Sequence, residues 1–236
     1  MYLMGRHHQL TFSAILFVLI LHLEPVLAGS EKVNMRTHAA KEMLMRQFVM
    51  NIDLISDDLK VNSGSYITNP TAFHRFLIKR VSPHWNAKST MRALLGKSVF
   101  DNLSSIKRDS LANELERTWR RYAYEGIKRY SGQEFLVRDV SINQKGDRGW
   151  VKILIKSKLL PDIFIDLLVK KDLGEDWNAV DIRFKGITYV SVKKNAFREV
   201  VANRSASALE AQLFDKNQTY FSELCNQTSW KGLPPC

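Results

Sequence analysis

Few residues of the chain have the type and spacing that catalysis or metal binding needs. Beyond residue 28 the histidines are His38, His74 and His84, and none belongs to a metal-binding motif. The acidic pairs Asp57-Asp58 and Glu175-Asp176 are expected in loops or at a turn, where charged side chains are usually solvated. The sequence has no nucleophile elbow, P-loop or dinucleotide-binding motif. We therefore predict no metal, no cofactor and no catalytic residues, although a triad is assembled in space and can escape a motif search.

The two cysteines, Cys225 and Cys236, both lie near the C-terminus. In an oxidising compartment they could close a small loop, and we predict a disulfide between them; two unpaired thiols are the alternative. With no histidine nearby they do not make a zinc site.

The first 28 residues have the pattern of a cleavable signal peptide. Arg6 precedes an apolar stretch over residues 11–23, and Val26-Leu27-Ala28 offers residues that a signal peptidase reads. The stretch is shorter than the ~20 residues that a spanning helix needs, so an uncleaved anchor is the less favoured alternative. We expect an exported, soluble chain with one domain over residues 29–222 and a tail over 223–236.

The composition is that of a globular protein. Of 236 residues, 45% are hydrophobic and 25% charged, which excludes collagen-like, disordered and multi-span membrane classes. The net charge is +11. The basic residues are dispersed in pairs, such as Lys128-Arg129 and Lys193-Lys194, without the aromatic residues of an RNA-binding signature. We expect weak electrostatic docking and no nucleic-acid partner, the alternative being a simply solvated basic surface.

Helical periodicity dominates the first 130 residues. We expect helices over residues 31–60, 70–80, 86–95 and 104–130, and two closing helices near 193–203 and 205–222. Residues 62–65 are expected to form a loop. Asn69-Pro70 is a helix start, Gly96 a helix end and Ser104 a helix cap.

Between these groups of helices the periodicity changes to two, which is typical of strands. We expect strands over residues 135–142, 150–157, 163–170 and 177–184, joined by short turns that make neighbours antiparallel. The predicted architecture is α+β, with helices packed on one face of a roughly four-stranded antiparallel sheet and an apolar cavity between them.

An ordered set of short motifs spans residues 83–213. It comprises Leu94-Leu95-Gly96 followed by Phe100, Ser104 to Lys107, the helix with Leu115, Trp119 and Tyr122, Tyr130 to Gln133, Trp177 to Asp181, Gly186 to Val190, Phe197, and Leu209 to Leu213. In order and spacing this set resembles the MlaC family of periplasmic phospholipid-binding proteins, also called toluene-tolerance proteins. Asn86 and Val99 depart from the family pattern, and the tail after Tyr220 has no counterpart in it.

The resemblance implies a periplasmic phospholipid carrier and no enzyme. Such a carrier exchanges lipid with an inner-membrane ABC transporter complex containing an MCE-domain protein and with an outer-membrane lipoprotein–porin complex, and so maintains outer-membrane lipid asymmetry. Its acyl chains lie in an apolar pocket between sheet and helices, with the headgroup near solvent.

The pocket candidates are the apolar residues of the long helix, the strands and their neighbours, and for each the alternative is simple core filling. They are Leu94, Phe100, Leu115, Trp119, Tyr122, Val151, Ile153, Ile155, Ile163, Ile165, Leu167, Val169, Val180, Ile182 and Ile187. Two other functions stay open: a secreted enzyme using Tyr122, Tyr124, Asp166 or Asp181, and an interaction module with a filled core.

Overall fold

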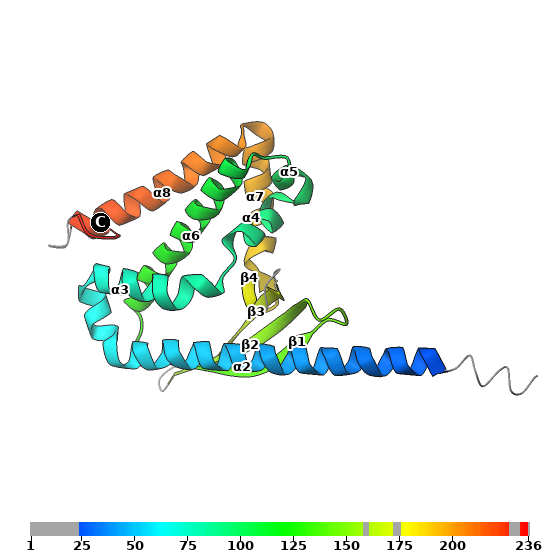
Figure 1. Cartoon of the computed structure of the whole chain (residues 1–236). Helices are drawn as coiled ribbons and strands as arrows, with labels where there is room; N and C mark the ends of the chain where they lie inside the picture. Colours follow the sequence, from blue (N-terminus) through cyan, green and yellow to red (C-terminus); the bar gives the residue numbers. More distant parts are fainter. Residues whose placement is uncertain (1–23, 158–160, 172–175, 227–231, 236) are drawn as a thin grey trace, which may run out of the picture.

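The computed structural model describes residues 24–157, 161–171, 176–226 and 232–235. In this part of the chain helices come first, an antiparallel sheet follows, and two helices close the fold (Figure 1). This confirms the predicted α+β class. The expected signal peptide, residues 1–28, lies almost wholly outside the described residues, and so does Glu175 of the second acidic pair.

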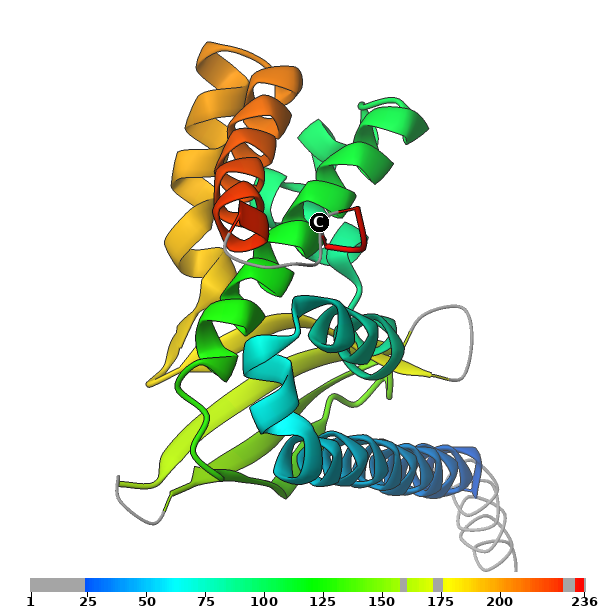
Figure 2. The ribbon, with the colours of Figure 1, turned by 90° about the vertical axis from the view of Figure 1, so that its left-hand side faces the viewer.

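The first described helix, α2 (Glu24–Thr68), has 45 residues and runs across the sheet (Figures 1 and 2). The loop predicted at residues 62–65 is wrong, and so is the loop position expected for Asp57-Asp58, because the helix continues through both. Asp58 accepts hydrogen bonds from the Asn62 amide, at 2.9 Å, and from the Tyr66 hydroxyl. These bonds support the last turns, and the buried Tyr66 ring, 5.4 Å from that of Phe73, anchors them.

A chain of short helical segments follows. The Asn69 side chain caps α3 (Pro70–Phe76) by accepting a hydrogen bond from the Ala72 N–H at 2.9 Å, as predicted. The predicted helix continues beyond residue 76 as the π-helical turn η1 (Leu77–Val81) and the 3₁₀ turn η2 (Ser82–His84). The helix α4 (Ala87–Leu95) ends at Gly96, whose φ of 89° favours glycine, and α5 (Lys97–Asp101) was not predicted.

Three longer helices form a bundle beside the sheet (Figures 1 and 2). They are α6 (Ser105–Ile127), α7 (Tyr189–Asn203) and α8 (Ala206–Asn226). Ser104 caps α6 as predicted, since its hydroxyl accepts from the Lys107 N–H at 3.2 Å. Helices α6 and α8 pack side by side, and Thr118 donates to the buried Asn217 between them at 3.1 Å.

The sheet has the strand order β1-β2-β3-β4-β5, and every neighbouring pair is antiparallel. The strands are β1 (Glu134–Ile142), β2 (Arg148–Lys156), β3 (Ile163–Lys171), β4 (Trp177–Phe184) and the two-residue β5 (Ile187–Thr188). The four predicted strands and their antiparallel order are confirmed; β5 is an addition too short for a periodic signal.

The two faces of the sheet have different partners. Val151, Ile153 and Val169 point to one face and pack against Leu44 and Phe48 of α2 in a buried core. On the opposite face the Arg183 guanidinium lies 3.9 Å from the centre of the Trp150 ring and pairs with Asp166 at 3.0 Å. The alternation seen in the sequence thus separates an apolar helix-covered face from a more polar one.

Two further apolar cores hold the helices together. One joins the end of α2, α3 and the ends of α6 and α8, with Phe73, Tyr124 and Phe221 among its members. The other joins α4, α5, α6 and α8 around Leu94, Leu115 and Leu209. Within the described residues we find no helix both long enough and apolar enough to cross a membrane.

Candidate ligand pocket

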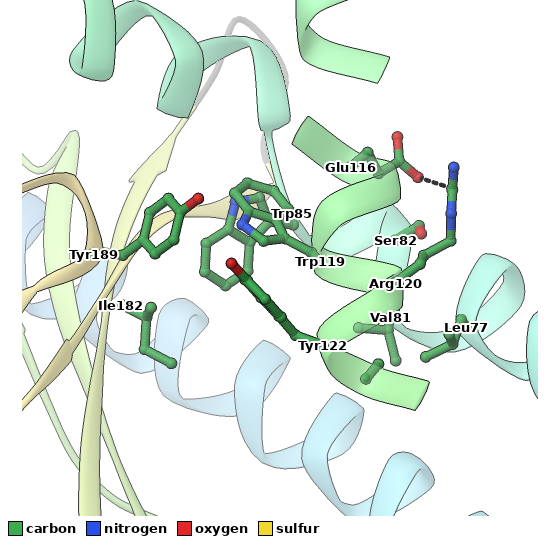
Figure 3. Close-up of a pocket in the computed structure, with 11 residues that line it drawn as sticks. Leu77, Val81, Ser82, Trp85, Glu116, Trp119, Arg120, Tyr122, Ile182 and Tyr189 are labelled. Atoms are coloured by element: carbon green, nitrogen blue, oxygen red, sulfur yellow. Dashed lines mark hydrogen bonds and ion pairs between the residues drawn. The ribbon is translucent and has the colours of Figure 1, made fainter. Parts of the chain in front are cut away.

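An apolar pocket lies where the helical bundle meets the sheet (Figure 3). Its volume is about 260 Å³. The walls come from η1 and η2, the following loop, α6, strand β4 and the start of α7. The lining residues are Leu77, Val81, Ser82, Trp85, Glu116, Trp119, Arg120, Tyr122, Ala123, Ile182 and Tyr189.

Two tryptophans dominate one end of this pocket. The ring centres of Trp85 and Trp119 are 4.4 Å apart, with the planes tilted by 58°. The Trp85 indole N–H donates to the Thr90 hydroxyl at 3.1 Å, and Thr90 in turn donates to the Val180 carbonyl at 2.6 Å. This relay ties the loop to β4 and satisfies the polar atom of a largely apolar ring, so the indole faces can line the pocket.

Two tyrosines complete the aromatic end (Figure 3). Tyr122 comes from α6 and is 40% exposed, whereas Tyr189 comes from the first turn of α7 and is partly buried. Burial raises the pKa of the Tyr189 phenol far above its ordinary value, and the nearby Tyr122 adds to that effect. The phenol therefore stays protonated at physiological pH and offers the pocket no negative charge.

The polar side chains of the pocket gather at the other end. Arg120 donates to Glu116 at 2.6 Å, one helical turn away on α6, and Ser82 lies nearby (Figure 3). Only 18% of the Arg120 side chain is exposed. The pocket therefore has an aromatic end and a charged end, which suits a ligand that is itself apolar at one end and polar at the other.

The sequence-predicted pocket residues separate into groups. Trp119, Tyr122 and Ile182 line the pocket. Those packed inside the apolar cores are Leu94, Phe100, Leu115, Val151, Ile153 and Val169, with Ile165 and Leu167 against the sheet core; Val180 is also buried. Ile155 and Ile163 line a separate hollow of about 210 Å³ beside Tyr130 and Phe135, and Ile187 is 61% exposed. Lipid contact by the first group stays a prediction.

Apart from the Glu116–Arg120 ion pair, the sequence analysis missed six of the residues that line the apolar pocket. They are Leu77, Val81, Ser82, Trp85, Ala123 and Tyr189. Leu77 lies in the helix predicted over residues 70–80 and Val81 directly follows it, so two apolar residues at helical spacing were present there. For Trp85 and Tyr189 no local signal exists, because their position depends on how the loop and α7 pack on the sheet.

Three of the four side chains proposed for an enzyme have structural roles, and the fourth, Tyr122, lines the apolar pocket. The Tyr124 hydroxyl donates to the Pro70 carbonyl at 2.7 Å, and Asp166 pairs with Arg183. The buried Asp181 accepts hydrogen bonds from the N–H groups of Ile182 at 2.9 Å and Val190 at 3.1 Å, at the start of α7. In the described part of the chain no group of three or more His, Cys, Asp or Glu side chains could hold a metal ion.

The cysteine prediction is partly outside the described residues. Cys225, in the last turns of α8, is disulfide-bonded. Cys236, its expected partner, lies outside the described range, so the particular pairing stays a prediction.

A helix-on-sheet domain with an apolar pocket between its helices and its sheet is suited to binding an apolar ligand. The sequence profile of the MlaC protein family matches residues 50–215, and the chain belongs to this family. The resemblance noted in the sequence is thereby confirmed.

The fold is also that of a solved structure. The phospholipid-binding protein from Ralstonia solanacearum, determined in complex with a phospholipid, superimposes with a TM-score of 0.62. The two sequences are 15% identical, and the match covers 73% of this chain and 98% of the other. A search of curated proteins found no match.

Proposed function

We propose that the protein is a phospholipid carrier whose pocket binds an acyl chain and excludes water from it. The observation that carries this proposal is the apolar pocket with an aromatic end and a charged end. Membership of the MlaC family and the shared fold with a phospholipid-binding protein support it.

The size of the pocket sets a condition on the mechanism. Ligand pockets commonly measure about 300–1,000 Å³, and this one, at about 260 Å³, is smaller than that range. In the described conformation it holds part of an acyl chain, so a complete phospholipid requires the walls to separate. Helix segments with π geometry often mark functional sites, and η1 supplies two of the wall residues, Leu77 and Val81.

The energetics of transfer favour a shuttle over a permanent store. Each methylene buried from water contributes about 0.8 kcal/mol. In the donor membrane those methylenes are already buried, so exchange between membrane and protein is close to balanced. Small changes in docking or pocket width then decide whether lipid is taken up or released.

The cellular setting is the finer part of the proposal and follows from the family. The carrier acts in the periplasm between an inner-membrane ABC transporter complex with an MCE-domain protein and an outer-membrane lipoprotein–porin complex. Its role there is to maintain outer-membrane lipid asymmetry.

Lipid extraction of the purified protein followed by mass spectrometry tests the carrier. We expect intact phospholipid to co-purify with the wild-type chain. Ala123→Phe places a large ring in the pocket from α6 and is expected to reduce the bound lipid at least fivefold. Ala39→Phe, at an exposed helical position of α2, is the matched control and is expected to retain it.

Two outcomes would count against the carrier, and a third would count against this pocket as its lipid site. A lipid-free wild-type protein that hydrolyses an ester supports the enzyme alternative. A lipid-free protein without activity supports an interaction module. Equal lipid content in Ala123→Phe and Ala39→Phe would place the lipid somewhere other than this pocket.

A further inference from the structure

A second pocket, with three basic side chains in its lining, shares Arg120 with the apolar one. It is lined by His74, Arg117, Arg120, Phe221, Gly232, Pro234 and Pro235, and its volume is about 290 Å³. We call it the basic pocket. Arg120 lines both pockets, so the charged end of the apolar pocket and the basic pocket meet at this side chain.

Three nitrogen-bearing side chains face this space from two helices. Arg117 and Arg120 come from successive turns of α6, and His74 comes from α3. The side chains of the two arginines are 25% and 18% exposed, so both are largely withdrawn from solvent. The Nδ1 atom of His74 is buried and has no hydrogen-bond partner among the described residues.

The arginines retain hydrogen-bonding capacity beyond their ion pairs. Arg117 Nη1 donates to Glu114 at 3.2 Å and Nη2 donates to Gln218 at 3.2 Å. Arg120 uses Nη1 for Glu116. Within the described part of the chain its Nε and Nη2 make no hydrogen bond, and a guanidinium has five N–H donors in all. Donors held in a fixed fork suit the oxygens of a phosphate group.

The electrostatics of His74 agree with this arrangement. Burial is the main cause that lowers the pKa of His74, and the nearby Arg120 cation lowers it further, against the opposing effect of Glu116. At neutral pH the His74 ring is therefore mostly uncharged, and it can offer a phosphate oxygen the N–H of a neutral imidazole.

We propose that the basic pocket, through Arg120, Arg117 and His74, binds the phosphate group of a lipid whose acyl chain occupies the apolar pocket. This inference rests on the proposed carrier function and adds a headgroup site to it. Because Arg120 lies at the junction, one molecule can place its chain and its phosphate in the two pockets at once. Glu114 and Glu116 balance the two arginine charges, so recognition works through short hydrogen bonds more than through long-range attraction.

Paired equilibrium binding measurements test the site. Lipid-free full-length protein is titrated with a fluorescent phospholipid and with a diacylglycerol that has the same acyl chains but no phosphate. We expect the wild type to bind the phospholipid at least tenfold more tightly. Arg117 does not line the apolar pocket, so Arg117→Gln is expected to reduce that ratio at least fivefold while leaving diacylglycerol affinity unchanged. Arg120→Gln is expected to reduce the ratio by at least the same factor.

Two control variants separate recognition from folding. Arg204→Gln removes an exposed arginine at the end of α7, away from both pockets, and is expected to keep the wild-type ratio. The double variant Glu116→Gln/Arg120→Gln removes both charges of the ion pair. It leaves no unpaired carboxylate behind and is expected to lose the phosphate preference as Arg120→Gln does.

The outcomes distinguish this inference from the carrier proposal. Equal wild-type affinity for the two lipids, or a ratio unchanged in the Arg120 and Arg117 variants, overturns the headgroup site and leaves the carrier standing. Failure of both lipids to bind refutes the carrier itself. Sub-millimolar binding of inorganic phosphate to the diacylglycerol-loaded protein, without a preference for phospholipid, would identify a free-phosphate site and overturn the headgroup assignment.

Discussion

The centre of the Trp119 indole ring on α6 lies 4.4 Å from the ring centre of Trp85, which belongs to the loop between η2 and α4. The two residues are far apart in sequence, and their contact joins the helical bundle to the segment that rests on β4. Both rings line the apolar pocket, so they report directly on whatever enters it.

Tryptophan fluorescence is expected to follow lipid uptake. Acyl chains that replace water beside Trp85 and Trp119 lower the polarity around the indoles, so emission should shift to shorter wavelength on titration with phospholipid vesicles. Trp85→Phe/Trp119→Phe should lose most of the shift. Trp150→Phe, on the opposite sheet face under Arg183, should retain it. A shift that survives only when Trp150 is present would contradict the pocket assignment.

The Leu115→Ala variant tests whether Leu115 belongs to the hydrophobic core or to the lipid pocket. The Leu115 side chain is fully buried in the core shared by α4, α6 and α8. Its truncation should lower the free energy of unfolding by about 2–5 kcal/mol, the usual cost of such a cavity, with little change in lipid affinity. Chemical denaturation and lipid titration of the same sample measure both quantities. A large loss of affinity with unchanged stability would mean that Leu115 lines the lipid site.

Gly149→Ala is expected to destabilise the sheet where α2 crosses it. A Cβ atom at Gly149 would lie 2.4 Å from the backbone carbonyl oxygen of Ser141 and 3.1 Å from Leu44 Cδ2. Strand or helix must move to accommodate it, at a cost of about 1–3 kcal/mol.

Gly64→Ala provides the matched comparison for that variant. A Cβ at Gly64 in α2 meets no heavy atom within 4 Å, and alanine is the better helix former, by roughly 0.5–1 kcal/mol. Thermal unfolding should therefore show opposite shifts for the two variants. A lower melting temperature for Gly64→Ala would argue against the helical end of α2.

The Asp181 carboxyl is expected to make stability fall with rising pH. Burial is the main cause that raises its pKa above the ordinary value of 3.8, although hydrogen bonds from Val190 and Thr188 oppose the shift. The folded chain then holds the proton more tightly than the unfolded chain. Stability decreases as the pH rises from that ordinary value through the raised pKa, and is constant above it.

Melting temperatures between pH 3 and pH 8 measure this effect. Asp181→Asn keeps an oxygen for the two N–H donors and removes the ionisation. Its melting temperature should therefore rise relative to that of the wild type as the pH rises. Asp181→Ala leaves the N–H groups of Ile182 and Val190 unpaired and should cost about 1–3 kcal/mol throughout. Parallel pH profiles for wild type and Asp181→Asn would refute the raised pKa.

Glu210 is expected to have the opposite pH dependence. Its carboxylate accepts hydrogen bonds from Lys107 and Ser110, which hold α8 against α6. The Lys107 bond is the main cause that lowers the pKa of Glu210 from the ordinary 4.5, followed by that of Ser110. The stabilisation is therefore present above that ordinary value and is lost as the pH falls through the lowered pKa.

Glu210→Gln tests this interaction against Glu223→Gln, an exposed position of the same helix. At pH 7 the first variant should lose up to ~1 kcal/mol, the usual upper range for a partly exposed ion pair. The loss should shrink as the pH falls below 4.5 through the lowered pKa of Glu210, whereas the second variant should resemble the wild type throughout. If the loss of stability persists at low pH, the effect of Glu210→Gln comes from packing and not from the ion pair.

Local signals in the sequence determined most of the secondary structure. Caps such as Asn69 and Ser104 act within one helical turn, and the alternation in β2 to β4 states which side of each strand is apolar. The end of α2 escaped this reasoning, because polar residues 62–65 read as a loop until Tyr66 anchors them to Phe73.

The sequence by itself determined an α+β domain with an apolar sheet face and a family resemblance. Only the tertiary structure decided that Leu94 and Val151 fill cores while Trp119 and Ile182 border a cavity. It also decided that Arg120 stands between an apolar and a basic pocket. The physical reason is that periodicity specifies the direction of a side chain, whereas a cavity depends on how tightly distant elements close over it.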